Sequence, residues 1–195
     1  TALTTLSDTN VSLTIDSSGT ATIPFIYDDA GSLTVTASYT GSSGLDSGLS
    51  LTGTSSAIVV APASFQISGI PAAPLMAGVA FNAAVTAMNG CATPAATTNF
   101  GRESTATNVL ITSTNPQPAL GNATAISKTL VAGGASSVFT AGAASTSLTW
   151  NEVGTIDLKA DSTAYLGSAL NITGTQAAVG RFKPAYFDMQ GWPPG

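Results

Sequence analysis

The sequence predicts an all-β chain built from tandem immunoglobulin-like β-sandwiches. Apolar and polar side chains alternate over short runs separated by Gly, Ser, Asn, Asp and Pro, while the 3.6-residue period of amphipathic helices is nearly absent. Parts of the chain also recur at a spacing of 121–123 residues. Because a repeat sets domain boundaries before local propensity does, these two observations together define the organisation of the chain.

The clearest part of the repeat is a strand–turn–strand segment. Residues 25–37 (FIYDDAGSLTVTA) return as residues 148–160 (LTWNEVGTIDLKA), with apolar, aromatic, acidic and glycine positions in line. Two shorter matches join 49–54 to 170–175 and 62–65 to 184–187. We therefore divide the chain into residues 1–61, the second half of one repeat; 62–182, a complete sandwich; and 183–195, a linker with the opening strand of a following repeat.

Turn residues and alternation place the strands in order. In the first piece we expect strands near 10–16, 20–27, 32–40 and 49–60. In the complete unit we expect them near 64–69, 79–88, 106–113, 123–131, 136–140, 144–150, 155–161 and 169–181. This number of short strands in about 120 residues is typical of a two-sheet sandwich of immunoglobulin size.

The repeated corner supplies the predicted structural residues. An aromatic side chain, Tyr27 or Trp150, precedes an acidic turn, in which an acidic or amide side chain can hydrogen-bond the turn backbone. Glu152 is the acidic residue of the second turn. Gly31 and Gly154 can adopt a positive φ at little cost. Alternation buries one face of each strand. We therefore expect core positions for Phe81, Val85, Leu148, Trp150, Ile156, Leu158 and Ala160, and in the first piece for Phe25, Tyr27, Leu33 and Val35.

The connections between repeats are short and contain proline. Residues 61–63 and 182–184 occupy equivalent places, and proline there removes a backbone donor and restricts the passage from one domain to the next. We expect a semi-rigid stalk.

Composition excludes several classes of partner. The net charge is −5, and the five Lys and Arg residues form no basic stripe, so we expect no nucleic acid. Residues 1–61 carry five Asp and neither Lys nor Arg. No apolar run approaches the ~18–20 residues of a membrane span. If the protein is exported, we expect its targeting segment upstream of Thr1. The single cysteine, Cys91, is either free or paired with a cysteine outside this sequence.

Catalytic chemistry finds little support. The chain contains no histidine, which removes the usual general base and the commonest zinc ligand, and we expect no enzyme activity and no cofactor. Asp28 and Asp29 are weak candidates for Ca²⁺ ligands, although turn-capping or solvated acids are the preferred interpretation. Arg102 and Glu103 are either a local salt bridge that fixes a loop, which we prefer, or part of a ligand-facing edge.

Several short motifs suggest a family. The segments 81–89, 98–103, 150–154, 165–167 and 179–182, which include Asn-Phe-Gly-Arg-Glu and Gly-Arg-Phe, resemble the MshQ-like proteins associated with the mannose-sensitive haemagglutinin type IV pilus. The resemblance covers mainly residues 62–188. It implies an extracellular or cell-surface, pilus-associated role in a Gram-negative bacterium, and it carries over no catalytic residue.

The leading functional hypothesis is therefore a structural or adhesive stalk module whose partners are neighbouring immunoglobulin-like domains or other copies in a fibre. The alternatives are a module that binds a host or surface glycan or Ca²⁺, and an accessory β-domain of a larger extracellular enzyme. Because residues 1–61 form only half a sandwich, we also expect an open apolar face there, completed by strands from chain outside this sequence or from a neighbouring copy.

Overall fold

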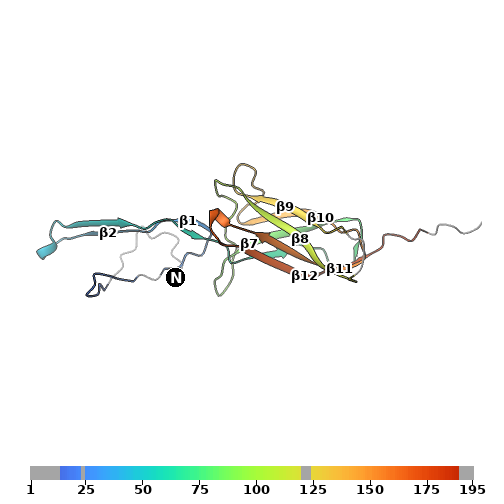
Figure 1. The fold of residues 1–195 in the computed structure, drawn as a ribbon, viewed down its shortest axis with the longest axis horizontal. Helices are drawn as coiled ribbons and strands as arrows, with labels where there is room; N and C mark the ends of the chain where they lie inside the picture. The colour runs from blue at the N-terminus through green and yellow to red at the C-terminus, as the bar shows by residue number, and fades with distance from the viewer. Residues whose placement is uncertain (1–13, 23–24, 120–123, 189–195) are drawn as a thin grey trace, which may run out of the picture.

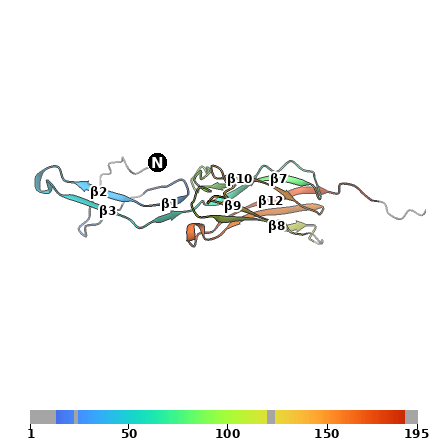
Figure 2. The ribbon, with the colours of Figure 1, turned by 90° about the horizontal axis from the view of Figure 1, so that it is seen from above.

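The computed structural model describes residues 14–22, 25–119 and 124–188, and within them the regular secondary structure is almost entirely β-strand. Only two short 3-10 turns, Gly44–Asp46 and Tyr165–Gly167, interrupt them. The molecule is elongated (Figure 1), with a sandwich in the middle, a hairpin projecting from one end and residues 184–188 leaving at the other. The same arrangement is seen from above (Figure 2). The predicted all-β, immunoglobulin-like fold class is confirmed.

Two sheets form the sandwich. The first has the order β10 (Ala143–Thr149), β7 (Ala80–Met88), β5 (Ser64–Ser68). The second has the order β6 (Leu75–Met76), β12 (Ile172–Lys183), β11 (Gly154–Ser162), β8 (Thr107–Gln117), β9 (Ser127–Ala132). All pairings are antiparallel except that of β12 with β6.

The core between these sheets follows from alternation along the strands. On β11, Ile156, Leu158 and Ala160 are fully buried. Burying a side chain of the size of Ile or Leu stabilises the fold by roughly 1.5–3 kcal/mol. All seven residues predicted for this core are buried, which confirms the strand register: Phe81, Val85, Leu148, Trp150, Ile156, Leu158 and Ala160.

Aromatic side chains gather at the end of the sandwich that faces the hairpin. The ring of Phe100 packs edge-on against Phe65 and Phe139, with centroids 5.6 and 5.1 Å away, and stacks on Tyr165 at 5.7 Å. Such pairs contribute about 0.5–1.5 kcal/mol each beyond the area that they bury. The loops that carry Phe100 and Tyr165 are therefore fixed to the core.

The projecting hairpin consists of β1 (Gly31–Leu33), β2 (Thr36–Thr40), β3 (Ser50–Thr54) and β4 (Ile58–Val60). Its register repeats that of β11 with β12. Ala37 pairs with Gly53, as Ala160 pairs with Gly174. Leu33 pairs with Ile58, as Ile156 pairs with Val179. The internal repeat is thus present in the backbone pairing as well as in the sequence.

The burial of the hairpin differs from that of its counterpart. Leu51 is 54% exposed, whereas the matching Ile172 is fully buried. The expectation that Phe25 is a core residue is wrong, because its side chain is 38% exposed. Tyr27, Leu33 and Val35 are only half-buried. The reason is physical: in the described residues no strands cover the hairpin as β5, β7 and β8 cover or flank β11 and β12.

Several strand boundaries depart from the prediction. No strand forms in the described part of 20–27, where the Asp16 carboxylate accepts the N–H groups of Ser18 and Thr20 in a turn. Residues 10–13 of the predicted strand 10–16 lie outside the described residues, and 14–16 are not in a strand. Segment 136–140 also forms no strand, because Ser137 Oγ accepts from the Phe139 N–H and donates to the Gly101 carbonyl.

Strand β8 runs four residues beyond the predicted end, to Gln117. The two-residue strand β6 was not predicted from the sequence. No helix among the described residues has the length and apolar character needed to cross a membrane.

Candidate functional site

The candidate functional site is the junction between the hairpin and the sandwich. Only residues 61–63 separate the end of β4 at Val60 from the start of β5 at Ser64. Pro62, in the middle of this connection, is buried and its ring fixes φ. The chain therefore passes from one repeat to the next with little freedom.

Asp29, just before β1, holds the two repeats together. Its Oδ1 accepts the main-chain N–H of Ala30 at 2.8 Å and that of Asn99 at 3.0 Å. Its Oδ2 accepts the Thr98 hydroxyl at 2.9 Å. Thr98 and Asn99 lie in the loop between β7 and β8 of the sandwich, so the carboxylate joins segments 69–70 residues apart. Hydrogen bonds to a charged acceptor are stronger than neutral ones, contributing about 1.5–3 kcal/mol each where they are shielded from water.

Two asparagines add reciprocal contacts from the sandwich. Asn89 Nδ2 donates to the main-chain carbonyl of Asp28 at 2.9 Å, while Asn89 Oδ1 accepts the N–H of Ala95 at 2.9 Å. Asn99 Nδ2 donates to the Tyr27 hydroxyl at 3.2 Å. Asn89 thus orders its own loop while it binds the neighbouring repeat.

Ala30 completes the junction with an apolar contact. It is 1% exposed and belongs to the same buried cluster as the core of the sandwich. Val59 and Ala61 pack against that cluster from the other strand of the hairpin. The base of the hairpin is therefore fixed by packing and by hydrogen bonds.

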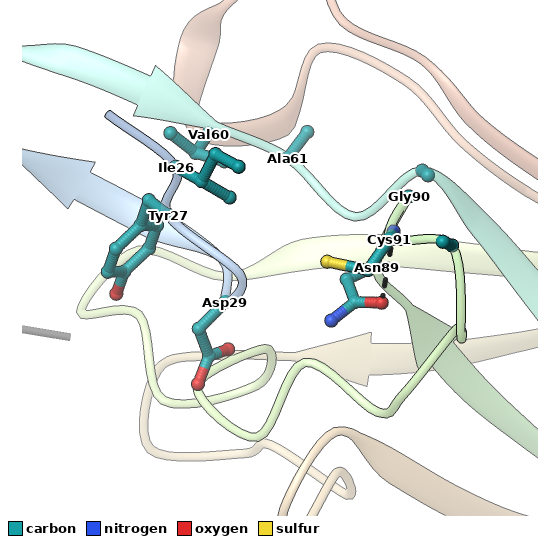
Figure 3. A pocket seen from close by; sticks show the side chains of 10 residues that line it. Ile26, Tyr27, Asp29, Val60, Ala61, Asn89, Gly90 and Cys91 are labelled. Atoms are coloured by element: carbon teal, nitrogen blue, oxygen red, sulfur yellow. Dashed lines mark hydrogen bonds between the residues drawn. The ribbon is translucent and has the colours of Figure 1, made fainter. Parts of the chain in front are cut away.

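A cavity of about 550 Å³ lies in this junction. Its lining comes from both repeats, with Ile26, Tyr27 and Asp29 on one side and Asn89 and Cys91 on the other (Figure 3). Apolar side chains, including Val60 and Ala61, supply much of the wall. Asp29 is engaged in the hydrogen bonds described above, and Cys91 is a half-buried free thiol. The cavity therefore brings together no acid–base or nucleophile–base pair.

The predicted corner residues lie where the repeat placed them. Gly154 has φ 105°, and a Cβ there would come 1.9 Å from the Gln117 carbonyl oxygen, so both conformation and space require glycine. Gly31 also has a positive φ, 144°, but open space around it. Trp150 is buried, and its indole N–H has no hydrogen-bond partner among the described residues. Glu152 is half-buried.

Asp29, rather than Glu152, makes the predicted bond from an acidic side chain to the turn backbone. The carboxylate of Asp29 accepts the Ala30 N–H. In the parts of the chain that the structure describes, no three or more His, Cys, Asp or Glu side chains gather as metal ligands would. Asp28 and Asp29 contribute to the junction through one carbonyl and one carboxylate.

The pairing expected between Arg102 and Glu103 is wrong. Between these two described residues there is no ion pair; instead Glu103 Oε2 accepts the Gly101 N–H at 2.7 Å and Oε1 accepts the Tyr165 hydroxyl at 2.5 Å. Burial, reinforced by the neighbouring Glu103 carboxylate, raises the pKa of Tyr165 well above its usual value. Glu103 fixes a loop as predicted, but with a different partner.

No pattern in the sequence predicted the contacts of Asp29 with Thr98 and Asn99. Asp29 meets Thr98 and Asn99 only because the hairpin packs against the sandwich. The loop that carries Thr98 and Asn99 was singled out in the sequence only by the family motif at 98–103.

Comparisons with known proteins agree with the immunoglobulin-like fold and give no activity. No curated protein sequence matches the chain. Residues 1–54 match the first Ig-like domain, and residues 152–193 match the third domain, of a family described as a domain of unknown function, DUF6701. Within the described residues, the first match includes β1 to β3 and the second includes β11 and β12. Neither description names a pilus, and the chain is similar to two domains of this family, of which the first is described as Ig-like.

Proposed function

We propose that this chain is a structural module of a secreted stalk or fibre, in which tandem immunoglobulin-like repeats are joined rigidly so that they extend a surface structure. The observation that carries this proposal is the junction at Asp29. A flexible tether needs no side chain from one repeat to bind the main chain of the next, whereas a stalk that transmits length and direction does.

The elongated arrangement in Figure 1 supports the same function. The hairpin and residues 184–188 leave the sandwich at opposite ends of its long axis. Successive repeats joined in this way add length rather than bulk, and the short connection at Pro62 limits bending between them. The module then needs neither a cofactor nor a catalytic residue.

The location that we propose is the surface of a Gram-negative bacterium, in association with a type IV pilus. The support for this is the resemblance of segments such as 98–103 and 179–182 to the MshQ-like proteins. The partners in this proposal are neighbouring repeats of the same fibre, and an adhesive function follows if the far end of the fibre contacts a host surface.

The rigidity of the junction is tested by replacing Asp29→Ala. The substitution removes the acceptor for Ala30, Thr98 and Asn99, and we expect small-angle X-ray scattering to show a wider distribution of hairpin orientations. Asp28→Ala is the matched control, because Asp28 binds Asn89 through its main-chain carbonyl, which the substitution retains. A scattering profile of Asp29→Ala identical to that of Asp28→Ala and the unmodified protein would remove the basis of the proposal.

A further inference from the structure

The face of the hairpin that corresponds to a sandwich core is open. Leu51 and Tyr39 are 54% and 48% exposed, and a Cβ added to Gly53 would meet no atom within 4 Å. A two-stranded hairpin with an open apolar face is only marginally stable in water, and its unpaired edges invite another strand. The described residues thus leave a surface that favours a partner.

The second repeat shows what covers such a face. Gly174, the counterpart of Gly53, lies directly under β5: a Cβ on Gly174 would come 1.9 Å from the carbonyl oxygen of Phe65. The Phe65 side chain is buried in the core, and the matching hairpin residue Ile172 is buried as well. A β5-type strand that carries phenylalanine over a glycine is therefore the element that the described residues do not supply to the hairpin.

A segment with the matching sequence, which is not in a strand here, lies exposed at the other end of the molecule. Residues 184–187 (PAYF) correspond to residues 62–65 (PASF), which lead into β5. Phe187, the counterpart of Phe65, is 88% exposed, and Tyr186 is 80% exposed. Figure 1 shows this segment at the end opposite the hairpin.

We propose that residues 184–187 of one copy dock on the hairpin of a second copy, with Phe187 over Gly53 as Phe65 lies over Gly174. The interface is heterologous, because the two surfaces differ and lie at opposite ends, so each added copy presents a new free hairpin and assembly proceeds head to tail. This inference goes beyond the proposed function, since a stalk module can be rigid without self-association.

The charges of the two regions are weakly opposite, because residues 31–60 carry only Asp46 while residues 181–188 carry Arg181, Lys183 and Asp188. Residues 1–61 carry five Asp and no Lys or Arg. Arg181 and Lys183, next to the docking segment, are exposed. Opposite charges favour encounter of the hairpin of one copy with the C-terminal segment of another rather than with a second hairpin. Association should therefore weaken with added salt.

Sedimentation velocity over micromolar to millimolar protein concentration tests the proposal. We expect concentration-dependent oligomers, and Phe187→Ser should weaken association about tenfold or more, since a full apolar contact is lost. Tyr186→Ser is the matched control: it places at 186 the residue that β5 carries at Ser64, so association should persist. A protein that stays monomeric throughout, or oligomers that are unaffected by Phe187→Ser, would overturn the proposal.

Mixing two variants identifies the pair of surfaces. Phe187→Ser retains the hairpin, and Gly53→Gln retains the docking segment but fills the space above β3. At a concentration where the unmodified protein associates but a variant of about tenfold weaker association does not, each alone should stay monomeric. Its thermal unfolding should be unchanged, because both sites are exposed in the monomer. Together they should form a 1:1 dimer that does not grow. A mixture that stays monomeric, or Gly53→Gln that still polymerises alone, would show that the hairpin is not the acceptor. Neither result bears on the rigidity of the Asp29 junction.

Discussion

Tyr165 donates its hydroxyl hydrogen to Glu103 across 2.5 Å, from a position that is fully buried at the end of the sandwich core. The contact joins two segments of the sandwich. Glu103 lies in the loop between β7 and β8, and Tyr165 lies in the 3-10 turn that follows β11. Glu103 also binds the Gly101 N–H, and a Cβ on Gly101 would clash with Phe139 at 2.4 Å. One carboxylate therefore fixes the loop on which the junction residues Thr98 and Asn99 depend.

This contact predicts a loss of stability in alkali. In the unfolded chain Tyr165 loses its proton near the ordinary pKa of 10.0, whereas burial and the Glu103 carboxylate raise the pKa in the folded protein. The folded state therefore binds more protons above pH 10, and the free energy of unfolding should fall as pH rises through that value. Urea unfolding between pH 8 and pH 11, roughly spanning that ordinary pKa, measures the slope. Tyr165→Phe should be less stable at neutral pH but show a smaller decrease; equal slopes would contradict the assignment.

Matched glycines in the two repeats should differ in how much stability they lose on substitution by alanine. Gly174→Ala places a Cβ against the Phe65 backbone and should destabilise the sandwich by about 1–3 kcal/mol or more. Gly53→Ala meets open space and should change the free energy of unfolding by less than about 0.5 kcal/mol. Chemical denaturation of the two variants at a concentration where the protein is monomeric makes the comparison. Similar losses in both would mean that the hairpin face is already covered.

Trp150 should be important for its volume and not for its indole N–H. The side chain is buried, and no described residue accepts a hydrogen bond from its Nε1. Trp150→Ala should destabilise the sandwich by about 3–5 kcal/mol because it opens a cavity. Trp150→Phe should cost less than half as much, since no hydrogen bond is lost and most of the ring volume is kept. Thermal and denaturant unfolding of both variants test the ratio; equal losses would indicate a partner for Nε1.

Removal of divalent cations should leave the junction intact. Both oxygens of Asp29 accept hydrogen bonds from the protein, so the junction holds together without a metal ion. We expect the same melting temperature in a chelator and in millimolar Ca²⁺. A rise in melting temperature with Ca²⁺ that Asp29→Ala abolishes would assign Asp29 to a metal site instead.

The sequence predicted the sandwich well because its strands obey local rules. Alternation alone placed Leu148, Ile156 and Leu158 in the core, and the repeat located Gly31 and Gly154 at positions of positive φ. The same alternation failed for Phe25. Its pattern matches that of Leu148, but burial depends on strands that cover it, and a pattern within one strand carries no information about their presence.

The junction was only partly predictable for a similar reason. Proline at 62 and acids at 28–29 are visible in the sequence, but the donors to Asp29 come from a loop about 70 residues away. The partner of Glu103 was missed because its neighbour Arg102 offers an obvious charge, whereas Tyr165 approaches only when the sheets pack. Long-range pairing of polar groups is set by the fold, and sequence spacing does not encode it.

The central claim, a rigid junction between repeats, is tested most directly by ¹⁵N relaxation of the monomeric protein. Amides of the hairpin strands β1 to β4 and of the sandwich strands should report one common, anisotropic rotational diffusion tensor, because Asp29, Asn89 and Ala30 join them into one body. Separate correlation times, with the hairpin reorienting faster than the sandwich, would contradict the claim.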